Sequence, residues 1–214
     1  MTSPTTPSAE FEGLGPERLG LERLERALHD LNRPDRDLPV GGYPESRMAD
    51  GPDRAAVLVP ILQSPEPAIL LTVRNRALTK HAGQVALPGG RRDPGETFPA
   101  GTALREASEE VGIPADRVRL LGLLDRVNTI SRFRITPVVG LVDAAIEPRA
   151  CPDEVSHLFR FPLAWALDLE RYREHRVLRH GQTFTVMSVA GGHWPIWGAT
   201  ATILHQLAIA ANRA

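Results

Sequence analysis

The sequence is poor in several features that would each point to a particular class of protein. Its single cysteine, Cys151, excludes an internal disulfide framework and fits a reducing compartment. No apolar run approaches the roughly 20 residues needed to cross a bilayer, and residues 1–13 lack the basic and apolar regions of a secretory signal. Lysine and arginine number 25 against 26 aspartates and glutamates, so no surface built to coat nucleic acid or an anionic membrane is indicated. We therefore expect a cytoplasmic protein that binds neither.

What is present is the composition of a soluble globular protein, with 42% hydrophobic and 24% charged residues. A chain of 214 residues suits one sizeable core with extensions. Lys80 is the only lysine, and every other basic side chain except the histidines is an arginine. A lysine retained against this bias, just upstream of an acidic stretch, is a candidate for a specific role. Codon usage explains the bias itself equally well.

Hydrophobic periodicity predicts strands with helices before, among and after them. Residues 17–31 place leucines at near-helical spacing before Pro34, which predicts an amphipathic helix, and the proline-rich residues 32–53 predict an irregular connector. Pro137 suggests that its strand is at an edge or contains a bulge. Strands are expected at 54–63, 68–74, 118–127, 134–142 and 154–161, a hairpin over 176–189 turning at residues 180–182, and helices at 162–168 and 198–212. These elements predict one mixed sheet covered by helices on both sides.

The most informative stretch is residues 89–113, where a glycine pair leads through a polar loop into a short helix rich in acids. Glu106, Glu109 and Glu110 lie on one face of that helix, because each residue turns it by about 100°. Alanine, leucine and valine residues form an apolar stripe on the opposite face, which predicts that this face packs on a core. The clustered like charges repel one another, and a divalent cation with oxygen ligands is the simplest compensation.

The flanking residues suit such a helix. Thr97 is placed to cap its start, Pro99 suits its first turn, and Gly112 can adopt the left-handed conformation that ends it. Arg105 lies four residues before Glu109 and can hold that carboxylate in one orientation. Mg²⁺ or Mn²⁺ is expected rather than zinc, because no cluster of cysteine or histidine accompanies the acids. Such a cation favours hydrolysis of a phosphoanhydride, since it neutralises phosphate oxygens and activates water.

A charged helix of this kind is more often a solvated surface, and it is the longer pattern that favours a site. The stretch resembles the Nudix box, in which a glycine, five residues, a glutamate and seven residues precede REUXEEXGU, where U is aliphatic. The matching positions are Gly90, Glu96, Arg105, Glu106, Glu109, Glu110, Gly112 and Ile113. Two features depart from the pattern: eight residues separate Glu96 from Arg105, and Ala107 occupies the first U position. The extra residue lengthens the loop and affects the expected placement of Glu96 more than that of the helical glutamates.

The preceding stretch, residues 70–90, resembles the motif LLTxR(S/A)xxxRxxxGxxx(F)PGG of Nudix hydrolases that act on coenzyme A. The matching positions are Leu70, Leu71, Thr72, Arg74, Gly83, Pro88, Gly89 and Gly90. Asn75 replaces serine or alanine, Thr79 replaces the second arginine, and Leu87 replaces phenylalanine. The lengthened box and the IWGATATIL run at 196–204 are also similar to this subfamily.

The resemblance implies an α/β (α+β) fold, namely an α/β/α sandwich with a mixed central β-sheet. It implies a Nudix hydrolase domain over residues 51–214, preceded by a helix and connector over 17–50 and a disordered tail over 1–16. The implied activity is metal-dependent cleavage of the diphosphate of coenzyme A or acyl-CoA to adenosine 3′,5′-bisphosphate and 4′-phosphopantetheine or its acyl form. The implied partner is therefore a small molecule, and the proline-rich N-terminal segment is a candidate contributor to a homodimer.

Residue by residue, the resemblance implies that Glu106 and Glu110 are the principal ligands of Mg²⁺ or Mn²⁺. Glu109 would be a third ligand or the base, beside Arg105 as a catalytic residue. The residues expected to face the substrate are Arg74, Lys80, Gln84, Gly89 and Gly90. Cationic and amide donors suit a diphosphate there, and Lys80 or Arg76 could replace the donor lost at Thr79.

Glu154 is the candidate general base, because it precedes a strand where the family tends to recruit such a group, although a surface acid is an equally good interpretation. His157 and His175 could also titrate near neutrality, but a lone histidine in a strand is more often structural. Two other functions remain open. One is the same chemistry on another nucleoside diphosphate derivative, such as ADP-ribose or a dinucleoside polyphosphate. The other is a ligand sensor of Nudix fold that has lost catalysis, against which the complete REXXEE pattern speaks. Nothing supports a scaffolding role.

Overall fold

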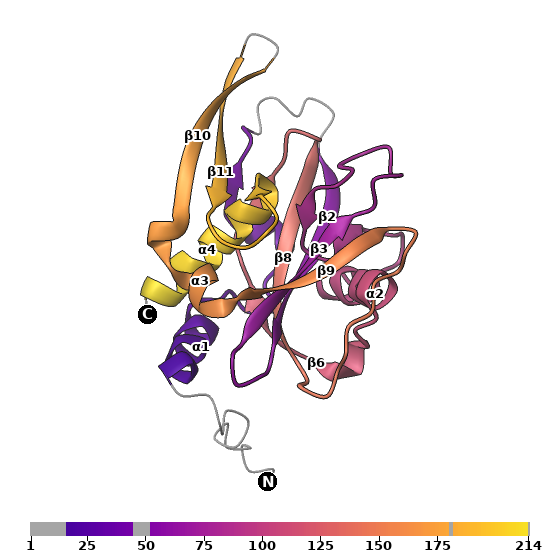
Figure 1. Ribbon diagram of the computed structural model, residues 1–214, viewed down its shortest axis with the longest axis vertical. Coiled ribbons are helices and arrows are strands. Elements are labelled where there is room, and N and C mark those ends of the chain that lie inside the picture. The colour runs from indigo at the N-terminus through magenta and orange to yellow at the C-terminus, as the bar shows by residue number, and fades with distance from the viewer. Residues whose placement is uncertain (1–15, 45–51, 180–181, 214) are drawn as a thin grey trace.

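A computed structural model describes residues 16–44, 52–179 and 182–213 of the chain (Figure 1). The tail predicted for residues 1–16 lies almost entirely outside the described residues. The helices are α1 (Pro16–Ala27), α2 (Ala100–Val111), α3 (Leu163–Leu167) and α4 (Ala199–Arg213). The strands are β1 (Val40–Gly42), β2 (Asp53–Leu62), β3 (Ala68–Arg74), β4 (Val85–Ala86), β5 (Gly89–Arg91), β6 (Val118–Leu123), β7 (Arg126–Asn128), β8 (Phe133–Val142), β9 (Val155–Pro162), β10 (Tyr172–Arg179), β11 (Gln182–Val189) and β12 (Ile196–Trp197).

The main sheet has nine strands and is mixed, as the sequence predicts. Its path runs β1-β7-β8-β2-β3-β4, with β5 also paired to β2, β6 to β8 and β9 to β3. Strands β2 and β8 are parallel along their whole length, from Asp53 opposite Phe133 to Leu62 opposite Val142. Their neighbours β3, β5 and β6 pair antiparallel to them. A separate three-stranded sheet, β10-β11-β12, carries the predicted hairpin, whose turn at residues 180–181 lies outside the described part of the chain.

The central strands are buried on both faces, which is why their sequences are almost continuously apolar. Along β2 the side chains alternate between two cores: Val57, Val59 and Ile61 belong to one, and Ala56 and Leu58 to the other. Helices α1, α3 and α4 supply the first core and α2 supplies the second. The predicted arrangement of helices on both sides of a mixed sheet is therefore confirmed, and Figure 1 shows α2 and α4 on either side of the sheet.

Four local predictions differ from the structure, namely the end of the first helix, the irregular connector, the edge position of Pro137 and the cap of α2. The first helix ends at Ala27 and not at residue 31, because His29 and Leu123 exchange two backbone hydrogen bonds of 2.9 Å. The connector contains the short strand β1, which pairs with β7 in parallel. Pro137 lies in the central strand β8 and not at an edge, although the alternative of a bulge has a counterpart nearby, where the pairing of β6 with β8 shifts register between Leu120 and Gly122. Pro137 lies opposite the break between β6 and β7, where no described strand residue would accept the hydrogen bond that proline cannot donate.

The start of α2 also differs from expectation. Thr97 makes no capping bond with its side chain; instead its carbonyl oxygen accepts a hydrogen bond of 2.7 Å from the N–H of Gly101, and Pro99 stands at the N-cap. The predicted end is confirmed, since Gly112 has φ 67° and ψ 28°. Among the helices of the described residues, none has both the length and the apolar character that crossing a membrane requires.

Candidate active site

Helix α2 is fixed to the sheet by one face and presents acids on the rest of its surface. Ala103, Ala107 and Val111 are fully buried in the core between α2 and the sheet. This is the apolar stripe seen in the sequence, and its small side chains let the helix approach β2 and β5 closely. The glutamates that follow these positions are consequently held against the glycine pair of β5.

Glu106 and Glu110 lie one helical turn apart, against Gly89 and Gly90. The Gly89 N–H donates a 3.0 Å hydrogen bond to Oε2 of Glu110. A Cβ atom added to Gly90 would lie 2.4 Å from Oε1 of Glu106, so only glycine leaves room for that carboxylate. Both acids are well buried, with side-chain exposures of 15% for Glu106 and 4% for Glu110.

Burial governs the ionisation of these two acids. Loss of solvation is the largest influence on both, and it raises the pKa of Glu106 above its ordinary value and that of Glu110 to about 7. The Gly89 hydrogen bond and the charge of Arg74 oppose the rise in the pKa of Glu110, without cancelling it. Two poorly solvated carboxylates one helical turn apart favour the binding of a positive charge between them.

Arg105 lies at the centre of the hydrogen bonds that organise the acids. Its guanidinium donates to Glu96 at 2.5 Å, to Glu109 at 2.7 Å and to Glu106 at 2.8 Å. The bond to Glu96 is the largest of the influences that raise the pKa of Arg105. The predicted contact between Arg105 and Glu109 is therefore present, while Glu109 itself remains 56% exposed at the edge of the cluster.

Glu96 is placed firmly despite the longer loop before α2. Its carboxylate also accepts hydrogen bonds from the Thr102 hydroxyl at 2.7 Å and from the Asp93 N–H at 2.9 Å. These bonds, led by the one from Arg105, lower the pKa of Glu96 to about 2. The additional residue is accommodated within the loop, and Glu96 still ties that loop to the helix.

Glu154 reaches the same site from a third part of the chain. The Cys151 N–H donates to the carbonyl of Glu110 at 2.9 Å, and the Asn75 N–H donates to the carbonyl of Glu154 at 2.8 Å. These bonds tie the segment before β9 both to α2 and to the end of β3. The negative charge of Glu154 contributes to the raised pKa of Glu106 and of Glu110, and its side chain is exposed.

Arg74, at the end of β3, points into the same cluster. Its Nη1 lies 3.5 Å from Oε1 of Glu110, a contact that the sequence did not predict. The pairing of β3 with β9 shifts register between Val73 and Arg74, and such irregularities commonly redirect a side chain. The sequence signalled the importance of Arg74 through the motif, but its partner is 36 positions away and only the fold brings them together.

The other candidates lie in the loop between β3 and β4, in β9 and in the β10–β11 hairpin. Lys80 is exposed in the loop between β3 and β4, and the Gln84 side chain is hydrogen-bonded to His81 at 2.9 Å. His157 packs beside Trp194, with ring centroids 5.2 Å apart. His175 bonds Ser188 across the β10–β11 hairpin at 2.7 Å. The contacts of both histidines match the structural interpretation.

The described residues fit a divalent cation chiefly through a pair of carboxylates. In the part of the chain that the structure describes, no group of three or more histidine, cysteine, aspartate or glutamate side chains is arranged to hold a metal ion. Mg²⁺, however, is commonly held by one or two carboxylates and completes its coordination with waters and substrate phosphates. Glu106 and Glu110, buried together with raised pKa values, supply such a pair.

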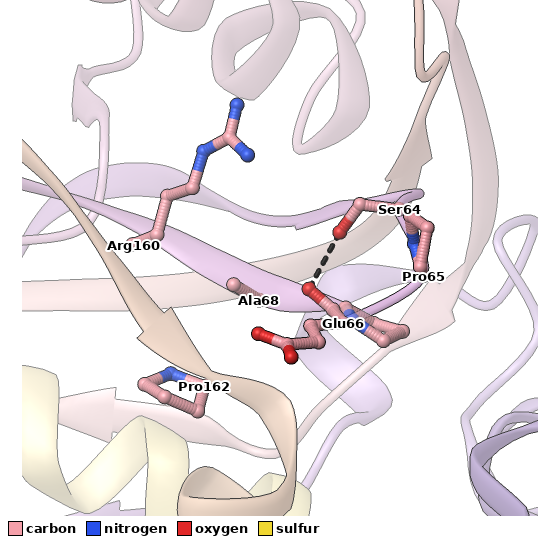
Figure 2. A pocket seen from close by; sticks show the side chains of 7 residues that line it. Ser64, Pro65, Glu66, Ala68, Arg160 and Pro162 are labelled. Carbon is pink, nitrogen blue, oxygen red and sulfur yellow. Dashed lines mark hydrogen bonds between the residues drawn. The ribbon is translucent and has the colours of Figure 1, made fainter.

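A pocket lies at the other end of the sheet. It is lined by residues of the β2–β3 turn and of β9, namely Ser64, Pro65, Glu66, Pro67, Ala68, Arg160 and Pro162 (Figure 2). It adjoins Ala68, the first residue of β3, whereas Arg74 is the last. At a rise of about 3.3 Å per residue the two ends are roughly 20 Å apart, so this pocket is not part of the acidic site.

Residues 52–180 match the model of the NUDIX domain family, which covers most of the chain and includes every acid of the site. The chain belongs to the Nudix family. Nudix hydrolases generally use divalent cations such as Mg²⁺ or Mn²⁺ and act on small molecules, and the Glu106–Glu110 pair fits the first of these properties.

Two relatives agree with this assignment, and one solved structure is similar to the chain. The chain is 45% identical over 165 residues to Nudix hydrolase NudL of Photorhabdus laumondii, covering 77% of this chain and 88% of the relative. It is 46% identical over 156 residues to Nudix hydrolase NudL of Salmonella paratyphi B, covering 73% of this chain and 81% of that protein. The structure of a MutT Nudix hydrolase from Burkholderia pseudomallei, 26% identical, aligns over 72% of this chain and 97% of that one with a TM-score of 0.44.

Proposed function

We propose that this Nudix hydrolase cleaves the diphosphate of coenzyme A or of an acyl-CoA. The products would be adenosine 3′,5′-bisphosphate and 4′-phosphopantetheine or its acyl form. The observation that carries the hydrolytic part is the buried Glu106–Glu110 pair, whose pKa values the charge of Glu154 helps to raise. The coenzyme A part is supported by the similarity of residues 70–90 to the coenzyme A motif. That stretch contains β3, its following loop and the glycine pair that contacts the acids.

In this proposal Glu106 and Glu110 hold Mg²⁺ or Mn²⁺. The cation, when bound, supplies charge neutralisation at the phosphates and a water that is more easily deprotonated. One hydrogen bond from Arg105 holds the carboxylate of Glu106, and one from the Gly89 N–H holds that of Glu110. Preorganised donors of this kind avoid reorganisation during the reaction.

Glu154 is the proposed general base. Its carboxylate would accept a proton from the attacking water as the bond to phosphorus forms and the phosphoanhydride bond breaks. Glu109 is a less suitable base in this proposal, because its carboxylate is already engaged by Arg105 at 2.7 Å. We retain Glu109 as a candidate third ligand at the exposed rim of the cluster.

The substrate contacts proposed from the motif are Arg74, Lys80, Gln84 and the glycine pair. Lys80 is exposed in the loop between β3 and β4, where its ammonium would contact a phosphate of the substrate. The glycine pair lies against the carboxylates of Glu110 and Glu106, so a diphosphate held at these acids would lie beside it. Thr79 occupies the position at which the coenzyme A motif has its second arginine. Arg76, which is exposed in the same loop, can supply that charge.

The test is product identification. Purified protein incubated with coenzyme A and Mg²⁺ or Mn²⁺ should release both products. Glu106→Gln and Glu110→Gln should each lower kcat by about 10³-fold or more while the protein stays folded, because a lost charge-stabilising group costs a few kcal/mol of the barrier. Absence of turnover with either cation would refute the proposal.

A second candidate is the same chemistry on another nucleoside diphosphate derivative, which the substitution at Thr79 favours. A panel containing coenzyme A, acetyl-CoA, ADP-ribose and a dinucleoside polyphosphate, compared by kcat/KM, separates the two. A tenfold or larger preference for coenzyme A would support the first candidate. Nucleotide binding without turnover or a cation requirement would instead support a non-catalytic sensor.

A further inference from the structure

Arg74 places one of the protein's own cations against a carboxylate of the site. Its Nη1 lies 3.5 Å from Oε1 of Glu110, and the exposed fractions of the two side chains are 25% and 4%. A buried charge is costly unless it is paired. The other oxygen of Glu110, Oε2, accepts the hydrogen bond from Gly89. Both oxygens of this carboxylate are therefore engaged by the chain itself.

The backbone around Arg74 is held in place while its side-chain contact is long. The Arg74 N–H donates to the Gln84 carbonyl at 2.9 Å, and the Arg74 carbonyl accepts from the Gly83 N–H at 3.1 Å. The Nε atom of Arg74 is buried and has no hydrogen-bond partner among the described residues. A guanidinium with one long ion pair and one unsatisfied N–H can change partner at small cost.

We propose that Arg74 is the internal counter-ion of Glu110 and that it competes with the divalent cation for Oε1 of this carboxylate. The inference rests on the proposed function, because it takes Glu110 as a cation ligand. A cation that binds Oε1 either displaces the guanidinium or lies beside a like charge. Once displaced, Arg74 has several unsatisfied donors next to the cation, and these suit a phosphate oxygen of the substrate.

Competition has a consequence that simple structural support does not. If Arg74 and the cation share one oxygen, removal of Arg74 tightens cation binding. It lowers the unfolding free energy only of the cation-free protein. Thermodynamic linkage makes the two effects equal in free energy. The gain in cation-binding free energy on mutation equals the difference between the unfolding free energy lost without the cation and that lost with the cation bound. An arginine that merely supports the fold would lower stability equally in both states.

The experiment compares the full-length protein with Arg74→Gln, using Mn²⁺ alone as the probe at about pH 8.5. This pH lies above the pKa of about 7 that burial gives Glu110 in the unmodified protein, which limits competition between protons and Mn²⁺ for the carboxylate. Mn²⁺ affinity is measured by isothermal titration, and urea unfolding is followed in EDTA and in saturating Mn²⁺. The Kd of Arg74→Gln for Mn²⁺ should be lower by about 5- to 10-fold. The lowering of its urea midpoint should be clear in EDTA and smaller in Mn²⁺.

Arg119→Gln is the matched control. Arg119 is also partly buried, with 34% of its side chain exposed, and it pairs with Glu25 at 2.9 Å on another part of the sheet. Its replacement should lower the urea midpoint equally with and without Mn²⁺ and leave the Kd unchanged. Arg74→Lys retains the charge and should tighten binding less than Arg74→Gln. If Arg74→Gln does not fold, Arg74→Lys serves as the test variant in the same two measurements.

The possible failures are distinguishable. An unchanged or higher Kd for Arg74→Gln, with normal Mn²⁺ binding by the unmodified protein, would overturn the competition and leave the proposed function standing. If the unmodified protein does not bind Mn²⁺, the cation site itself is refuted, and the role of Arg74 with it.

Discussion

Glu154 and its neighbour Asp153 are both exposed acids just before β9, and the charge of Glu154 is among the largest influences that raise the pKa values of Glu106 and Glu110. We expect Glu154→Gln to lower kcat by about 10²- to 10⁴-fold, the usual contribution of a general base, with KM changed little. Steady-state kinetics with the substrate that the panel selects would measure this. Asp153→Asn is the control and should retain full activity. Equal activities of the two variants would identify Glu154 as a surface acid.

The Glu96–Arg105 pair predicts a defined dependence of stability on pH. The pKa of Glu96 is lowered to about 2 from an ordinary value of 4.5, chiefly by the hydrogen bond from Arg105. A carboxyl group with a lowered folded-state pKa stabilises the protein fully above the unfolded value and loses this contribution as the pH falls from 4.5 towards 2. We therefore expect Glu96→Gln to be less stable than the unmodified protein at pH 7, by an amount that shrinks below pH 4.5.

Urea unfolding at a series of pH values in EDTA measures this difference. Asp143→Asn is the control, because Asp143 pairs with Arg117 at 3.1 Å at an exposed position where solvent screens the charges. Its effect should be small throughout. A stability difference for Glu96→Gln that persists unchanged down to about pH 2.5 would show that the Arg105 bond does not depend on an ionised Glu96.

At the scale of elements, the packing of α2 against β5 depends on two glycines that have different neighbours. A Cβ at Gly90 would meet the movable carboxylate of Glu106 at 2.4 Å, whereas one at Gly89 would meet the Ala56 carbonyl of β2 at 2.4 Å and the Val57 Cα at 2.5 Å. Gly90→Ala should therefore move a proposed cation ligand, and Gly89→Ala should disrupt the sheet backbone.

We expect Gly90→Ala to lower kcat by about 100-fold, as displacement of a reacting group by roughly 1 Å does, with little change in unfolding free energy. Gly89→Ala should lower the unfolding free energy by about 3 kcal/mol, the cost of severe overpacking. Parallel kinetics and urea unfolding of both variants test the distinction. Equal loss of stability in the two would show that β5 and α2 cannot adjust independently.

The sequence predicts the long elements well and the short ones poorly. β2, β3, β8 and β9 are visible because burial on both faces, or regular alternation, requires apolar and β-branched residues. Strands β1 and β7 have three residues each and are set by pairing, of β1 with β7 and of β7 with β8, so neither has a pattern of its own. The end of α1 is set in the same way, by pairing of His29 with Leu123.

The same division applies to the site. Glu106 and Glu110 are predictable because helical spacing alone places them one turn apart. The contacts of Gly89 and Arg74 with Glu110 span 21 and 36 positions, and no local pattern encodes such distances. Sequence similarity identified these residues as important, but only the fold shows that both meet the same carboxylate.

At the scale of the whole molecule, the region that matches the family model is packed between helices that lie outside it. Residues 52–180 contain α2 and α3, whereas α1 precedes this range and α4 follows it. Leu21 and Leu24 of α1 are almost fully buried in the same core as Leu204 and Leu207 of α4. Because these helices cover the sheet face opposite α2, they support the strands from which Arg74 and the glycine pair extend.

This packing predicts that α1 unfolds together with the sheet. Leu24 is fully buried, so Leu24→Ala should lower the unfolding free energy by about 2–5 kcal/mol while leaving a single transition. Leu178→Ala is the control, since Leu178 is 72% exposed and its truncation should cost less than about 0.5 kcal/mol. Urea unfolding followed by circular dichroism and by tryptophan fluorescence would give coincident curves if the molecule is one cooperative unit. An early transition seen only by circular dichroism would show that α1 separates from a core that is stable without it.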